Sequence, residues 1–128
     1  MVDGKKTVLY VEDNATNYRL VDLALADWKE LELASATTGE EGLRLAKERR
    51  PAAILLDVHL PDIKGDEVLR RLKSDPDTVD IPVLALSADS TALQMRQMLE
   101  AGAVNYLTKP LDLQRLMRAL KLILNSGS

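Results

Sequence analysis

The chain has 128 residues, a formal net charge of -3 and no cysteine. This length suits one domain with its own hydrophobic core, and the lack of cysteine excludes a disulfide framework and a thiolate nucleophile. The acidic balance argues against direct binding to nucleic acid, which depends on Lys and Arg side chains that neutralise phosphates. Because His59 is the only histidine, a Ser-His-Asp triad or a histidine-rich zinc site is disfavoured too.

No apolar run in the sequence approaches the roughly 20 residues that a membrane-spanning helix needs. The short segment before the first apolar run has no signal-peptide core. We therefore expect a soluble, cytoplasmic protein that has no membrane partner.

The first apolar run, residues 7–11, is followed by residues 15–28, in which apolar side chains recur at helical spacing. This pattern predicts a strand and then an amphipathic helix. The residues predicted on the apolar face of that helix are Leu20, Val21, Ala24, Leu25 and Trp28. Residues 31–36 alternate apolar and polar side chains, as expected of a strand near the edge of a sheet.

Thr38 and Glu41 match a capping box, in which the side chains of both residues bind backbone N–H groups at the start of a helix. That helix is predicted to end before Pro51. Residues 52–57 are then an apolar run without polar alternation, which is typical of a strand buried on both faces of a parallel sheet. The run ends abruptly at the carboxylate of Asp57.

The second half of the chain repeats the same alternation. A third helix is predicted around residues 68–72, a fourth strand at 81–86 and a fifth strand at 104–107. The fourth helix is predicted to begin near residue 90 and to end at Gly102. The residues predicted on its apolar face are Ala92, Met95 and Leu99.

Asp112 is predicted to cap the last helix, and residues 125–128 are predicted as a tail. The apolar positions of this helix are Leu113, Leu116, Met117, Leu120 and Leu124. Five strands that alternate with five helices predict an α/β fold with a doubly wound parallel sheet. No repeat or linker divides the chain, so we expect a single domain over residues 1–128.

Polar side chains stand at the carboxyl ends of four of the five predicted strands, where ligands of such sheets bind. Glu12 and Asp13 follow the first strand, Asp57 ends the third, Ser87 follows the fourth and Lys109 follows the fifth. Carboxylates that meet at one place repel one another and call for a cation. An all-oxygen site suits Mg²⁺, with Mn²⁺ as an alternative.

A hydroxyl and an ammonium group at the same edge suit a phosphoryl group. Ser87 can donate a hydrogen bond to a phosphoryl oxygen, and Lys109 can offset its charge. Asp57 lies at the centre of the predicted sheet, so we interpret it as a carboxylate nucleophile that becomes phosphorylated.

The sequence resembles the response-regulator receiver domain of the chemotaxis-regulator type from about residue 5 to residue 124. The matching motifs are VEDN at 11–14, LLDV at 55–58 with LP at 60–61 and Gly65, LSA at 86–88, AGA at 101–103 and YLTKP at 106–110. The resemblance implies a flavodoxin-like sheet with the strand order 2-1-3-4-5.

The resemblance also implies a reaction. Asp57 would accept a phosphoryl group from the phosphohistidine of a histidine kinase or phosphotransfer protein, with Ser87 and Lys109 contacting that group. Asp13, Asp57 and the backbone carbonyl of His59 would ligate Mg²⁺, and Glu12 would act mainly through a metal-bound water. The bond between Lys109 and the following proline would be cis.

A conformational switch is implied as well. Phosphorylation would draw Ser87 inward, and Tyr106 would follow, which reshapes the face made by the fourth helix, the fifth strand and the fifth helix. That face would control a downstream protein partner, or the domain would pass the phosphoryl group on. His59 and Asp89 would flank the phosphate and tune its hydrolysis, although we expect the His59 side chain itself to be an exposed loop group that contributes only its carbonyl.

Two other functions compete with this interpretation. A Mg²⁺-dependent phosphatase with an aspartyl nucleophile would need a second acid two residues after Asp57, where His59 stands. A flavodoxin-like cofactor binder would hold phosphate at the first turn, where residues 12–14 would repel it. The sequence leaves open a stand-alone regulator, a phosphorelay intermediate and a receiver that belongs to a hybrid histidine kinase or larger regulator.

Overall fold

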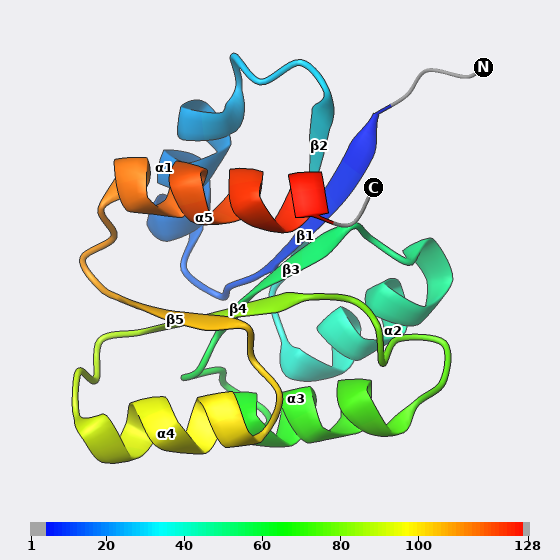
Figure 1. The fold of residues 1–128 in the computed structure, drawn as a ribbon, viewed down its shortest axis with the longest axis vertical. Coiled ribbons are helices and arrows are strands. Elements are labelled where there is room, and N and C mark those ends of the chain that lie inside the picture. Colours follow the sequence, from blue (N-terminus) through cyan, green and yellow to red (C-terminus); the bar gives the residue numbers. More distant parts are fainter. Residues whose placement is uncertain (1–4, 127–128) are drawn as a thin grey trace.

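The computed structural model describes residues 5–126, in which five parallel strands form one sheet in the order β2-β1-β3-β4-β5 (Figure 1). The strands are β1 (Lys6–Val11), β2 (Leu31–Ala36), β3 (Ala53–Asp57), β4 (Val83–Ser87) and β5 (Asn105–Thr108). The helices are α1 (Ala15–Leu25), α2 (Gly39–Arg49), α3 (Gly65–Ser74), α4 (Ala92–Glu100) and α5 (Leu113–Ser126). The predicted doubly wound sheet and its strand order are confirmed.

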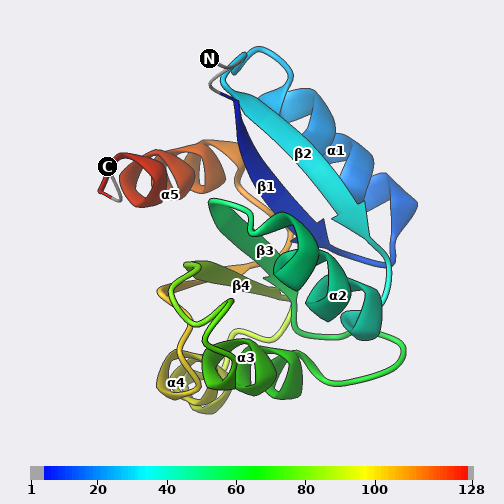
Figure 2. The same ribbon diagram turned by 90° about the vertical axis from the view of Figure 1, so that its right-hand side faces the viewer.

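Helices cover both faces of the sheet: α1 and α5 lie on one side, and α2, α3 and α4 lie on the other (Figures 1 and 2). Side chains of a strand alternate between these two layers. In β1, Val8 and Tyr10 pack with α1 and α5, whereas Leu9 and Val11 pack with the opposite helices. The sheet therefore separates two apolar cores.

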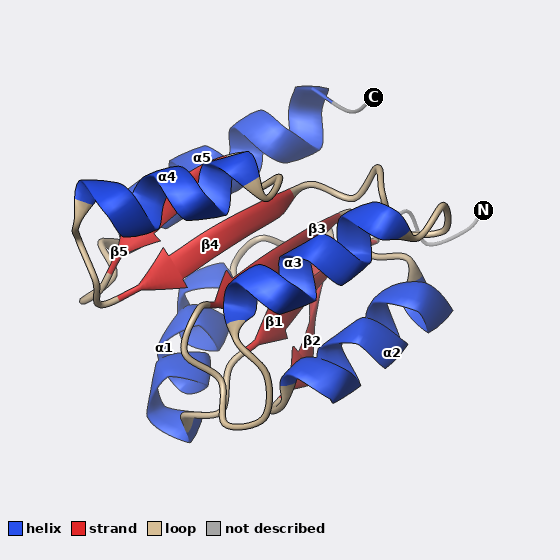
Figure 3. Ribbon diagram, turned by 90° about the horizontal axis from the view of Figure 1, so that it is seen from below, coloured by secondary structure: helices blue, strands red, loops and turns tan. Residues whose placement is uncertain are grey.

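The central strand β3 is buried over its whole length, as its unbroken apolar run predicts. Because the strands are parallel, their carboxyl ends lie along one edge of the sheet (Figure 3). The register pairs Asp57 with Leu86 of β4, and it pairs Ser87 with Thr108 of β5. The fold thus brings the chemically active strand ends together.

The cap of α2 contains one of the two hydrogen bonds of the predicted capping box. Thr38 Oγ1 accepts a hydrogen bond from the Glu41 N–H at 3.1 Å, as predicted. The Glu41 carboxylate, however, accepts from the N–H of Thr37 at 2.8 Å, and not from that of Thr38. Asp62, from the loop after β3, accepts from two further N–H groups at the start of α2, those of Gly39 at 2.8 Å and Glu40 at 2.9 Å. A distant loop therefore completes this cap.

Two helix faces were predicted incorrectly in part. Leu20 of α1 and Leu99 of α4 are 52% and 46% exposed, whereas Met98 is the fully buried residue of α4. The predicted first helix also ends at Leu25, and Trp28 lies half-buried in the following turn. These helices carry more apolar residues than the strip that each one presses on the sheet can bury.

Three predictions about the ends of the last two helices can be compared with the structure. Gly102 follows α4 with a φ of +120°, and the next N–H, that of Ala103, donates to the Met98 carbonyl at 3.0 Å, which confirms the glycine cap. Asp112 Oδ1 accepts from the Gln114 N–H at 3.0 Å, which confirms the N-terminal cap of α5. The predicted tail is helical at residues 125 and 126, and residues 127–128 lie outside the described residues.

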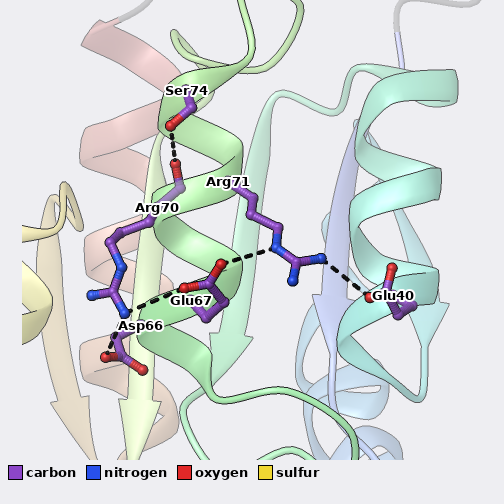
Figure 4. Close-up of polar contacts among 6 residues, drawn as sticks. All are labelled: Glu40, Asp66, Glu67, Arg70, Arg71 and Ser74. Carbon is purple, nitrogen blue, oxygen red and sulfur yellow. Dashed lines mark hydrogen bonds and ion pairs between the residues drawn. The ribbon is translucent and has the colours of Figure 1, made fainter.

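Charged side chains on α3 form a surface network that reaches α2 (Figure 4). Arg71 pairs with Glu67 of its own helix at 3.0 Å and with Glu40 of α2 at 3.2 Å, while Arg70 pairs with Asp66 at 3.2 Å. These pairs are solvent-exposed, so each contributes only about 0–1 kcal/mol. Apolar packing therefore carries most of the contact between the helices and the sheet.

Within residues 5–126, no helix combines the length and the apolar character that crossing a bilayer requires.

Candidate functional site

Three charged side chains from different strands meet at the carboxyl edge of the sheet. Lys109 Nζ lies 2.8 Å from Glu12 Oε1 and 3.4 Å from Asp57 Oδ2. The residues Glu12 and Asp57 are only 2% and 4% exposed. The adjacent bond from Lys109 to Pro110 is cis, as the family resemblance implies. The structure thus gathers the acids and the lysine that the sequence placed at separate strand ends.

Two further contacts fix the Glu12 carboxylate. The Tyr10 hydroxyl donates to Glu12 Oε1 at 3.1 Å, and the Asn14 N–H donates to Oε2 at 3.2 Å. Burial raises the pKa of Tyr10, and the Glu12 charge raises it further. Sequence reasoning missed Tyr10, although residues two apart on a strand share a face and Tyr10 stands two residues before Glu12.

The two buried acids have opposite pKa shifts. Burial raises the pKa of Asp57 to about 6, with repulsion from Glu12 adding to the rise, while the His59 N–H and Lys109 oppose it. For Glu12, burial would raise the pKa, but the hydrogen bond and charge of Lys109 and the Asn14 N–H outweigh it, so its pKa is lowered. Lys109 is half-buried, which lowers its pKa, but its contacts with Glu12 and Asp57 raise the pKa by more and keep the side chain protonated. The ionisation of Asp57 at neutral pH therefore lowers the free energy of unfolding.

This cost predicts how Asp57→Asn changes stability with pH in metal-free buffer. The folded state binds a proton at Asp57 near pH 6, while the unfolded state does so only near the ordinary value of 3.8. Ionised Asp57 therefore destabilises the fold above pH 6, and this penalty disappears as the pH falls toward 4. We expect Asp57→Asn to raise the free energy of unfolding by about 1–3 kcal/mol at pH 7.5 and by about zero near pH 4.

Urea denaturation of both proteins at several pH values, with EDTA present, measures this difference. Comparing the two proteins cancels the titration of acids that they share. A gain that stays constant from pH 7.5 to pH 4 would contradict a raised pKa at Asp57.

Carboxylate oxygens of Glu12, Asp13 and Asp57 lie within 4.8 Å of one another. Asp13 is exposed, whereas the other two acids are buried. Two of these carboxylates, those of Glu12 and Asp57, contact the ammonium of Lys109, and the oxygen atoms of all three acids are the ligands that a hard divalent cation prefers. The donor set therefore fits Mg²⁺. The His59 carbonyl as a further ligand stays a prediction.

A second group of predicted site residues surrounds Ser87, which is completely buried. Ser87 Oγ accepts from the Asp89 N–H at 3.0 Å, and the Tyr106 hydroxyl donates to the Asp89 carbonyl at 2.5 Å. Tyr106 is only 6% exposed, and burial raises its pKa. The backbone N–H of Lys109 donates to the Ser87 carbonyl at 2.8 Å, which connects this group to the acidic cluster.

His59 was predicted to be an exposed loop residue that contributes only its carbonyl; the exposure is confirmed, but the ring also makes a contact that was not predicted. The residue is exposed, but its Nε2 lies 3.3 Å from Ser87 Oγ. Its backbone N–H also donates to Asp57 Oδ1 at 3.0 Å. No sequence pattern reveals the ring contact, because it joins a loop residue to the end of a strand 28 residues further along the chain.

Comparison with known proteins gives one family. Residues 8–121 match the model of the response regulator receiver domain. The chain is 36% identical over 117 residues to the polar-differentiation response regulator DivK of Brucella anthropi, with 91% of this chain and 94% of DivK covered. It is 38% identical over 119 residues to the phosphate regulon transcriptional regulatory protein PhoB of Pseudomonas aeruginosa, with 93% of this chain and 52% of PhoB covered. The chain thus spans about half the length of PhoB.

A solved structure shares the fold. It is the receiver domain of the sensor histidine kinase PA1611 from Pseudomonas aeruginosa, described with a magnesium ion coordinated in its active site cleft. It superposes with a TM-score of 0.86 and 28% identity, over 97% of this chain and 99% of that one. With the matched family model and this superposition, the chain belongs to the response regulator receiver domain family.

Proposed function

We propose that the chain takes a phosphoryl group onto Asp57 from the phosphohistidine of a histidine kinase or phosphotransfer protein. The observation that carries this proposal is the placement of the Asp57 carboxylate. It is buried at the end of β3, with Oδ1 held by the His59 N–H and Oδ2 3.4 Å from Lys109 Nζ. Receiver domains are phosphoacceptor switches, and this residue has the position that such a role requires.

The proposed transfer uses the ionised Asp57 carboxylate as a nucleophile. An oxygen of Asp57 forms the bond to phosphorus while the bond from phosphorus to the donor's imidazole nitrogen breaks. Oδ2 is the better candidate, because Oδ1 already accepts from the His59 N–H. Lys109 lies beside Oδ2 and offsets the negative charge of the arriving phosphoryl oxygens. The chain is thus expected to catalyse only its own phosphorylation and dephosphorylation.

Mg²⁺ is the proposed cofactor, with Mn²⁺ as an alternative. Asp13, Asp57 and the His59 carbonyl would hold it, and Glu12 would act through a metal-bound water. When bound, the cation supplies charge neutralisation for the carboxylates and the phosphoryl oxygens. The oxygen cluster of the three acids supports this assignment, as does the magnesium described for the PA1611 receiver domain.

The proposed output is a change of the face formed by α4, β5 and α5. Ser87 would donate to a phosphoryl oxygen, and Tyr106 would respond through the loop that contains Asp89. The bond from the Tyr106 hydroxyl to the Asp89 carbonyl supports such a connection. Phosphorylation would then shift an equilibrium between two arrangements of this face and control a downstream protein partner, or the phosphoryl group would pass to another protein.

Family membership favours this function over a phosphatase of diffusible substrates and over a flavin carrier. We further propose that residues 1–128 act as one receiver domain in the cytoplasm, without direct contact with nucleic acid or membrane. Identifying the partner that supplies the phosphoryl group would show whether the domain works in a stand-alone regulator, in a phosphorelay or in a longer protein.

Incubation with an acyl phosphate and Mg²⁺, followed by intact-mass measurement, tests the proposed function. We expect a mass increase of one phosphoryl group in the presence of Mg²⁺ and none after chelation with EDTA, because the acids then repel the anionic donor. Restoring Mg²⁺ should restore the modification. Wild-type protein that remains unmodified at saturating donor and Mg²⁺ would refute the proposal.

A further inference from the structure

A buried hydroxyl and an exposed imidazole meet beside the proposed phosphoacceptor. Ser87, the last residue of β4, has no exposed surface, and its Oγ lies 3.3 Å from His59 Nε2. His59 belongs to the loop between β3 and α3, and the residue lies at the surface. The contact therefore joins the end of β4 to the loop that follows β3.

His59 touches both groups that the proposed reaction uses. Its backbone N–H donates to Asp57 Oδ1 at 3.0 Å, and its ring contacts the Ser87 hydroxyl. The two contacts place the residue between Asp57 and Ser87. The side chain is thus placed to influence Ser87 without contacting the phosphoryl group itself.

The hydrogen-bonding capacity of the Ser87 hydroxyl is small: one proton and two lone pairs. The Asp89 N–H occupies one lone pair at 3.0 Å. The imidazole takes either the proton or the second lone pair, according to its tautomer, and in both cases it holds Oγ beside the ring. A phosphoryl oxygen can only accept, so it needs the Ser87 proton and a hydroxyl that is turned toward Asp57.

We propose that His59 is a positioning residue that holds Ser87 in the arrangement of the unphosphorylated protein. This inference rests on the proposed function, since it concerns the regulation of the same site. Where Ser87 donates to His59, that hydrogen bond must break before Ser87 can donate to a phosphoryl oxygen on Asp57, and where Ser87 accepts from His59, the contact still restrains Oγ from turning toward Asp57. In both cases the free energy of the contact opposes the switch. His59 thereby sets how far a given phosphoryl group shifts the domain toward its switched arrangement.

Beryllofluoride, an analogue of the phosphoryl group that binds an aspartate oxygen with Mg²⁺, is the probe for this role. Its affinity is to be measured for wild type, His59→Ala and His59→Gln, each with and without Ser87→Ala. We expect His59→Ala to bind about three- to tenfold more tightly than wild type, because one hydrogen bond no longer competes. His59→Gln should stay within about twofold of wild type, since its amide reaches the same hydroxyl.

The Ser87→Ala background separates positioning from a general effect of the loop. Without the hydroxyl, His59→Ala should change the affinity by less than about twofold. The amide resonance of Asp89 gives a second readout, because that N–H donates to Ser87 Oγ. In His59→Ala without ligand, this resonance should move toward its position in the beryllofluoride-bound wild type.

Three results would overturn the role of His59: unchanged or weaker binding by His59→Ala, an equal gain in the Ser87→Ala background, or a His59→Gln variant that behaves as His59→Ala does. If wild type binds beryllofluoride and incorporates a phosphoryl group while His59→Ala behaves as wild type, the positioning role alone fails. If wild type does neither, the proposed function fails first.

Discussion

Asp57→Asn is expected to abolish phosphorylation by an acyl phosphate in the presence of Mg²⁺. An amide is a poor nucleophile, and no other carboxylate of the described chain has the position of Asp57 at the end of the central strand. Asparagine has nearly the shape of aspartate, so the fold should persist. Intact-mass measurement should therefore show complete loss of the phosphoryl adduct, and denaturation in urea should show a folded protein.

Asp80→Asn is the matched control, because the same substitution is made at an exposed acid that precedes β4 at the opposite edge of the sheet. This variant should gain the phosphoryl group as wild type does. An adduct of undiminished yield in Asp57→Asn would place the modification on another residue and remove Asp57 from the reaction.

Lys109→Met is expected to damage both stability and phosphoryl transfer. It removes the ammonium 2.8 Å from Glu12 and leaves two buried carboxylates without their cation. Breaking a buried ion pair costs several kcal/mol, and we expect a loss of about 3 kcal/mol in metal-free buffer at pH 7.5. The rate of phosphorylation should fall about a hundredfold or more, because a charge beside the transferred group is lost.

Added Mg²⁺ distinguishes electrostatic repulsion from poor packing in Lys109→Met. The cation should stabilise this variant more than wild type, since it neutralises carboxylates that Lys109 no longer pairs with. Lys109→Arg retains the positive charge and should lose less stability. Equal unfolding free energies for wild type and Lys109→Met, measured with EDTA present, would show that the ion pair contributes nothing to the fold.

The order of elements could be predicted because each strand is an apolar run and each helix a periodic segment. The acidic cluster could be predicted for a related reason: Glu12, Asp57 and Lys109 stand directly at strand ends, and parallel strands bring those ends together. The family motifs then supplied the roles expected of these residues. Neither inference required the conformation of a loop.

The failures concern contacts that depend on loops or on helix rotation. The contact of the His59 ring with Ser87 and the cap that Asp62 provides for α2 both depend on the conformation of the loop after β3. Gly65 allows that path, since a Cβ there would lie 2.6 Å from the Val58 Cα. Periodicity also could not show which of the neighbouring residues Met98 and Leu99 faces the sheet, because both are apolar.

The helices differ in how many side chains they bury against the sheet, and we expect them to differ in how readily they open. Met98 is the one buried residue among residues 92–100 of α4, all of which the structure describes, whereas α3 buries Val68, Leu69 and Leu72. Burying a methionine contributes about 1.5–3 kcal/mol, and allosteric coupling energies are about 1–3 kcal/mol. We therefore expect α4 to open locally more readily than α3, so that the proposed phosphoryl group on Asp57 would shift α4 while α3 stays in place.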